Sequence, residues 1–160
     1  MDNNNTYIDI LIGTLNRKNH ILEEIIKLTM LQERYLNEPD MDMDFFDDTL
    51  EKKAELIRGL DELDDGFEAI YKRVSEELKT RKENYKDKIL KLQELIKEVT
   101  DKGIRLEALE QQNKRKIETY FSSKKQEIKE FKKSNESVAN YYKSMADNPQ
   151  GESLFLDQKK

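Results

Sequence analysis

Residues 44–78 read DFFDDTLEKKAELIRGLDELDDGFEAIYKRVSEEL, and their apolar side chains recur every three or four residues without interruption. These apolar positions are Phe46, Leu50, Ala54, Ile57, Leu60, Leu63, Phe67, Ile70, Val74 and Leu78. Because an α-helix turns once in 3.6 residues, this spacing places all of them on one face. The stretch therefore predicts one long amphipathic helix that starts near Asp44 and must bury its apolar stripe against other helices.

A second stripe precedes this stretch and predicts a helix from about Tyr7 to Leu36. Its apolar positions are Ile8, Leu11, Leu15, Leu22, Ile25 and Leu28. Thr6, followed by Asp9 three residues later, resembles a capping box at the helix start. The run Asn-Glu-Pro at residues 37–39 should end the helix, since the residue before a proline disfavours helical geometry.

A third stripe follows and runs from Tyr85 to Tyr120, then more thinly through Ile128 and Phe131. It predicts a helix of about 50 residues, or roughly 75 Å, which is longer than the other two. No glycine or proline marks the turn before it, so we place that turn in the polar run at residues 79–84. A single unbroken helix through this run is the competing interpretation.

These stripes predict an all-α fold: an elongated antiparallel three-helix bundle with a long projecting third helix and a C-terminal tail. Residues 1–133 would form the bundle, and residues 134–160 a short helix followed by a flexible, partner-binding tail. Charged residues make up 39% of the chain, whereas there are only 5 glycines and 2 prolines. This composition favours long helices over a sheet of many strands.

Charge is distributed unevenly along the chain. Residues 37–78 carry 15 acidic and 5 basic side chains, whereas residues 79–133 carry 17 basic and 10 acidic ones. We expect the acidic second helix to lie beside the basic third helix. A nucleic-acid surface is disfavoured, because acidic residues interrupt the basic segment throughout.

Catalysis finds little support in the sequence. There is no cysteine, and the single histidine, His20, has no recognisable nucleophile around it. Asp40, Asp42, Asp44 and Glu51 have the spacing of a calcium loop, but Phe45 occupies the position that requires glycine. We therefore interpret these acids as helix-capping residues and expect no enzyme activity, no cofactor and no metal site.

The length and position of the apolar runs predict the cellular location. No run approaches 18 apolar residues, and the first residues have neither a basic region nor a long apolar run. We therefore expect no membrane insertion, no signal peptide and a cytoplasmic location. Asn113 interrupts the third stripe and has two interpretations: a buried amide that fixes helix register, or the point where the stripe turns toward solvent.

Two segments resemble the FlgN-type flagellar export chaperones. Residues 51–63, EKKAELIRGLDEL, are similar to the family's second-helix motif, in which an acid- and lysine-rich turn leads into repeated leucine pairs. Residues 108–117, ALEQQNKRKI, resemble its third-helix segment around an asparagine, here Asn113. The resemblance covers roughly residues 5–125.

This resemblance implies a cytosolic chaperone of flagellar type III export. Its partners would be the helical ends of hook-associated proteins from the hook–filament junction, together with components of the export apparatus. The similar FliT group, which serves the filament cap protein, is an alternative. From other classes, a structural coiled coil, an adaptor and a homodimer also remain open.

We expect the partner to bind the aromatic and aliphatic side chains that follow the bundle, since such side chains and methionine are common interface anchors. The predicted partner-binding residues are Tyr120, Phe121, Ile128, Phe131, Val138, Tyr141, Tyr142, Met145, Leu154, Phe155 and Leu156. An alternative is that the tail folds back over the bundle. The two interpretations are compatible if the partner displaces the tail.

Overall fold

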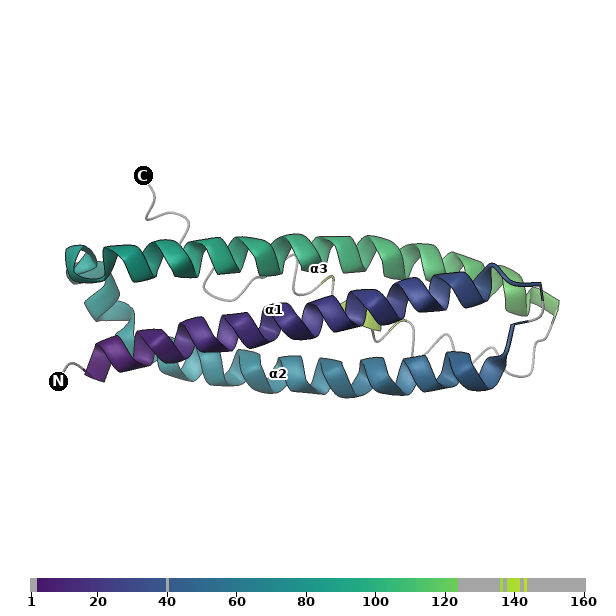
Figure 1. The fold of residues 1–160 in the computed structure, drawn as a ribbon, viewed down its shortest axis with the longest axis horizontal. Helices are drawn as coiled ribbons and strands as arrows, with labels where there is room; N and C mark the ends of the chain where they lie inside the picture. The colour runs from purple at the N-terminus through teal and green to yellow at the C-terminus, as the bar shows by residue number, and fades with distance from the viewer. Residues whose placement is uncertain (1–2, 40, 124–135, 137, 142, 144–160) are drawn as a thin grey trace.

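A computed structural model describes residues 3–39, 41–123, 136, 138–141 and 143 (Figure 1). Three long helices run antiparallel: α1 (Asn3–Leu36), α2 (Met43–Thr80) and α3 (Lys86–Tyr120). Two short 3₁₀ helices, η1 (Lys82–Tyr85) and η2 (Phe121–Ser123), follow α2 and α3. Residues 138–141 are helical, and none of the described residues lies in a strand. The all-α fold class is therefore confirmed.

The bounds of α1 and α2 follow from local chemistry. α1 ends at Leu36, as expected, but it begins at Asn3, so Thr6 lies inside the helix and the predicted capping box is wrong. α2 begins after Asp42, whose carboxylate accepts a hydrogen bond from the backbone N–H of Asp44 at 3.0 Å. Asp42 thus satisfies one of the unpaired donors at the helix start, the capping role inferred from the sequence.

The turn between α2 and α3 lies where the sequence placed it. α2 ends at Thr80, and the backbone N–H of Arg81 donates to the carbonyl of Glu77 at 2.9 Å. η1 then reverses the chain before α3 begins at Lys86. The single unbroken helix is therefore excluded.

The expected projection of the third helix is wrong. α3 has 35 residues, close to the 34 of α1 and the 38 of α2, and it ends at Tyr120. The reason is Phe121, which is 1% exposed and packs with Met41, Phe46 and Ile117 where α1 connects to α2. This contact ends α3 level with the rest of the bundle.

The predicted pairing of α2 with α3 also needs correction. α1 packs closely against both α2 and α3, whereas α2 and α3 approach each other much less (Figure 1). The basic α3 finds its acidic partners on α1. These ion pairs are Lys88–Asp9 at 2.8 Å, Lys102–Glu23 at 3.0 Å and Lys116–Glu33 at 3.3 Å. The net charge of a whole helix does not predict these pairs, because it does not report the face on which each acid lies.

Three apolar clusters follow one another along the bundle. At the α2–α3 end lie Ile8, Leu11, Leu15, Phe67, Val74, Leu78, Tyr85, Ile89, Leu92, Leu95 and Ile96. The middle cluster contains Leu22, Ile25, Ile26, Leu60, Val99, Leu106 and Val138. At the α1–α2 end lie Met41, Phe46, Ile117 and Phe121. Five positions of the stripe in residues 44–78 are not fully buried: Leu50, Ile57, Leu63 and Ile70 are half-buried, and Ala54 is exposed.

Candidate partner-binding site

The described C-terminal residues pack on the open side of the bundle, between α2 and α3. Val138 and Ala139 are buried, and Val138 belongs to the middle cluster. Glu136 forms an ion pair with Lys114 of α3 at 3.8 Å. The hydroxyl of Tyr141 donates to Asp64 of α2 at 3.3 Å. The segment thus bridges the two helices that approach each other least.

Asp64 joins this segment to the rest of the bundle. One of its carboxylate oxygens accepts a hydrogen bond from the Lys18 amine of α1 at 2.6 Å, and the other accepts from Tyr141. Burial raises the pKa of Tyr141, and the nearby carboxylates of Asp64 and Asp61 raise it further. Burial also raises the pKa of Asp61, with Asp64 and Asp65 adding to the effect. This acidic patch therefore favours hydrogen-bond donors and cations.

A buried polar network lies between the middle cluster and the α1–α2 end. The Lys53 amine of α2 forms an ion pair with Glu110 of α3, and both side chains are fully buried. The same amine donates to Gln32 of α1 at 2.8 Å, and Gln32 donates to Thr49 at 2.9 Å. Burial lowers the pKa of Lys53, an effect that Glu110 opposes. One charge pair thus connects all three helices.

Asn113 belongs to the same network. It is 1% exposed, and its amide donates to the backbone carbonyl of Thr29 at 3.0 Å. The interpretation of Asn113 as a buried, register-fixing amide is therefore favoured over the solvent-facing one. Among the described residues, one oxygen each of Glu110 and Asn113 lacks a hydrogen-bond partner, so small shifts of the helices would change this network.

Sequence reasoning missed this network, although a signal for it exists. Lys53 lies seven residues from both Phe46 and Leu60, and Glu110 lies seven from both Gly103 and Ile117, all of them buried. A heptad count therefore places both charges at core positions. We followed the apolar residues of residues 44–78 through Ala54 instead, which is exposed.

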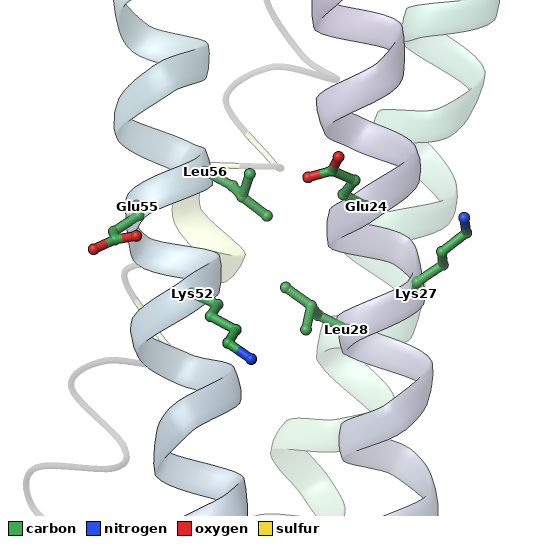
Figure 2. Close-up of a pocket in the computed structure, with 6 residues that line it drawn as sticks. All are labelled: Glu24, Lys27, Leu28, Lys52, Glu55 and Leu56. Atoms are coloured by element: carbon green, nitrogen blue, oxygen red, sulfur yellow. The ribbon is translucent and has the colours of Figure 1, made fainter.

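A second surface feature is a groove of about 440 Å³ between α1 and α2 (Figure 2). Leu28 of α1 and Leu56 of α2 point into it. The remaining lining residues are charged: Glu24, Lys27, Lys52 and Glu55. No pattern along the chain predicts this groove, because it depends on how two separate helices pack.

The predicted partner-binding residues fall into different places. Tyr120 is half-buried and packs edge-on against Phe121, with ring centroids 4.9 Å apart. Val138 is buried and Tyr141 half-buried in the middle of the bundle. The other predicted residues lie outside the described part of the chain: Ile128, Phe131, Tyr142, Met145, Leu154, Phe155 and Leu156. The assignment of these eleven residues to a partner stays a prediction.

The other singled-out features are consistent with surface roles. The His20 side chain is 86% exposed and lies 3.8 Å from Glu23. In the described ranges, no group of acidic or histidine side chains could hold a metal ion. The helices of those ranges also include none that is long and apolar enough to cross a membrane.

Comparison with known proteins identifies one family. The family model described as FlgN protein matches residues 1–149, which is nearly the whole chain. Neither the curated proteins nor the solved structures include a match.

Proposed function

From the fact that the chain belongs to the FlgN family of flagellar export chaperones, we propose that it binds the helical ends of hook–filament junction proteins. It acts in the cytoplasm, without catalysis, and delivers these cargo proteins to the type III export apparatus. One observation carries the proposal of a site: the open α2–α3 side of the bundle already holds a helical segment, residues 138–141. A surface that accepts a helix of its own chain suits a helix of another protein.

In the proposed complex, a cargo helix displaces the chain's own segment from this surface. The described contacts of that segment include the buried Val138 and Ala139, the ion pair of Glu136 with Lys114 and the hydrogen bond from Tyr141 to Asp64. Such a hydrogen bond contributes about 0.5–1.5 kcal/mol net. A cargo helix with larger apolar side chains would cover Leu60, Val99 and Leu106 in its place. The released Tyr141 and the predicted residues beyond it then pack against the cargo.

A structural stalk that dimerises along its length is the less favoured alternative. Side chains from all three helices of one chain already fill the three apolar clusters. No continuous stripe is therefore left over for a second chain along the described length.

Calorimetric titration against the C-terminal helical fragment of a hook–filament junction protein tests the proposal. Full-length chain should bind with one cargo helix per chain. Tyr141→Phe should bind more tightly, because it removes the segment's hydrogen bond to Asp64 and keeps the ring for the cargo. A chain ending at Ser123 should bind more weakly, because it keeps only Tyr120 and Phe121 of the eleven predicted anchors. The cut follows η2, since a cut at Lys116 would remove the buried Ile117 and Phe121.

The matching fragment of the filament cap protein distinguishes the FliT-like alternative. Tighter binding of the cap fragment would show that the filament cap protein, and not a junction protein, is the cargo. Binding of neither fragment, or a constitutive dimer by light scattering, would contradict the proposal. Circular dichroism of each variant confirms that loss of binding is not loss of fold.

A further inference from the structure

We propose that the groove between α1 and α2 is a second docking site, for one amphipathic helix of a partner protein. This helix carries a leucine-sized anchor, a basic residue on one side of the anchor and an acidic residue on the other. The groove lies between α1 and α2, whereas residues 138–141 lie between α2 and α3, and Leu56 of the groove also packs against the middle cluster that contains Val138. The proposal does not depend on which flagellar protein is the cargo.

The groove has a defined frame. Toward one end, Gly59 of α2 lies against Ile21 of α1, since a Cβ at Gly59 would lie 3.7 Å from the Ile21 side chain. Toward the other end, Lys53 and Thr49 of α2 are hydrogen-bonded to Gln32 of α1. These contacts fix the separation of α1 and α2 on both sides of the groove. The width of the opening between α1 and α2 is therefore set by the packing of the bundle.

The floor of the groove is apolar. Leu28 and Leu56 are both half-buried and point into the space between the helices (Figure 2). The volume of about 440 Å³ lies within the range of sites that enclose apolar groups. An apolar anchor inserted here would remove both leucines from water.

The charges of the rim specify the neighbours of that anchor. Glu24 of α1 lies toward the Leu56 end of the groove, and Lys52 of α2 toward the Leu28 end (Figure 2). Neither forms an ion pair with another described residue, unlike Lys18–Asp64 and the three α1–α3 pairs. A bound helix with a base toward Glu24 and an acid toward Lys52 complements both. On a helix, residues three or four from the anchor reach these positions.

The shape of the groove favours a helix over a second copy of this chain. Two copies meeting through this face would place groove against groove and leave both hollows empty, which forfeits packing contacts. The apolar floor is also only two leucines wide, whereas stable dimers bury about 1,200–2,000 Å². A helix is a ridge, and its side chains fill a groove between two helices.

The test uses full-length chain and a stapled, fluorescein-labelled 15-residue helix of alanine and glutamine. The helix carries one leucine, with lysine four residues before it and glutamate four residues after. Fluorescence anisotropy should show saturable binding. Leu28→Ser should weaken it about tenfold or more, the range for losing an apolar anchor. Leu90→Ser, at an exposed leucine of α3 outside the groove, is the matched control and should leave binding unchanged.

A charge swap tests the rim separately. Glu24→Lys should weaken binding of this helix and strengthen binding of a second helix that has glutamate on both sides of its leucine. Absence of saturation below about 1 mM would overturn the proposal. Equal effects of Leu28→Ser and Leu90→Ser would also overturn it. So would a Glu24→Lys effect that is the same for both helices. A dimer of this chain that Glu24→Lys dissociates would show that a second copy occupies the groove instead.

Discussion

The α2–α3 end of the bundle and the layer just before its apolar α1–α2 end have different cores. The cluster at the α2–α3 end consists of aliphatic and aromatic residues, including Phe67, Val74 and Leu92. Toward the α1–α2 end, the same helices bury Lys53 and Glu110 at equivalent heptad positions. Leu50 and Leu56, which lie three residues before and three residues after Lys53, remain partly exposed. The helical pattern is continuous, so the difference lies in side-chain chemistry alone.

This difference separates stability from specificity. An apolar core gains free energy in proportion to buried area and tolerates small shifts between helices. A buried charge pair gives little net stability, but it becomes costly when one partner is missing. Because Lys53 must meet Glu110 and Gln32 together, few alignments of the three helices satisfy it. The α2–α3 end thus supplies stability, and the polar network selects the register.

The largest effect is expected from breaking the buried pair. Glu110→Leu keeps most of the volume but leaves the Lys53 amine buried without its carboxylate. The free energy of unfolding, measured in urea at pH 7, should fall by about 3–5 kcal/mol. Glu94→Leu, at an exposed position of the same helix, should change it by less than about 0.5 kcal/mol. Equal effects of the two substitutions would remove the distinction between the two ends.

The pH dependence of Glu110→Leu follows from Lys53. Burial already lowers the pKa of Lys53 below its ordinary 10.5, and Glu110 opposes this shift. Without Glu110 the folded pKa falls further, so the unfolded chain holds a proton that the folded chain lacks between the two values. Stability rises with pH wherever the unfolded state binds more protons. The unaltered protein gains stability in the same way above its own folded Lys53 pKa, so the loss caused by Glu110→Leu should shrink only between the folded pKa of the variant and that of the unaltered protein, and should stay constant above it.

A loss of similar kind but different origin is expected at the apolar end. Leu92→Ala removes a fully buried side chain and leaves a cavity, which costs about 2–5 kcal/mol. Leu90→Ala, two residues away and exposed, is the control and should cost less than about 0.5 kcal/mol. Urea titration at several pH values should give the same loss throughout, because no charge is involved. A strongly pH-dependent loss would show that the two ends are coupled.

The sequence predicted the apolar end better than the polar one. Periodicity identified Phe67, Val74, Ile89 and Leu92 because each is apolar and lies three or four residues from a neighbouring apolar position of its own stripe. It passed over Lys53 because the residue is charged, although a heptad count places it at a core position. The partner Glu110 lies 57 residues away, so the pairing itself is not visible along one helix. Patterns along one helix do not report contacts between helices.

The same limit applies to the candidate sites. The sequence indicated that Val138 and Tyr141 take part in contacts, but the location of those contacts, between α2 and α3, depends on α1 occupying the other side of both helices. The end of α3 at Tyr120 depends on Phe121 packing with Met41 and Phe46, which come from the connection between α1 and α2. Each of these contacts joins segments that are distant in the chain, so no pattern within one segment predicts it.

A smaller change is expected when both charges are replaced together. Lys53→Met combined with Glu110→Leu leaves no unpaired charge and fills the core with apolar groups. Its effect should lie between neutral and a gain of about 1–4 kcal/mol. If the network selects the register, the amide NMR spectrum of this double variant should show extra peaks from alternative alignments. A single sharp set of peaks would assign register selection to another part of the bundle.

The smallest effect is expected at Asp61, which lies between the two ends, beside the patch that holds Tyr141. Burial, Asp64 and Asp65 raise the pKa of Asp61 above its ordinary 3.8. Below that value both folded and unfolded chains hold the proton, so Asp61 has no effect on stability. As the pH rises through the folded pKa, the folded chain must ionise an unfavourably placed carboxyl, and stability falls. Asp61→Asn should therefore stabilise the protein at pH 7 by less than about 0.5 kcal/mol and leave it unchanged below pH 3.8.

Glu62→Gln, an exposed neighbour, is the control, and thermal melts at both pH values compare the two. If Asp61→Asn stabilises the protein equally in acid, the effect comes from packing and not from the charge of Asp61.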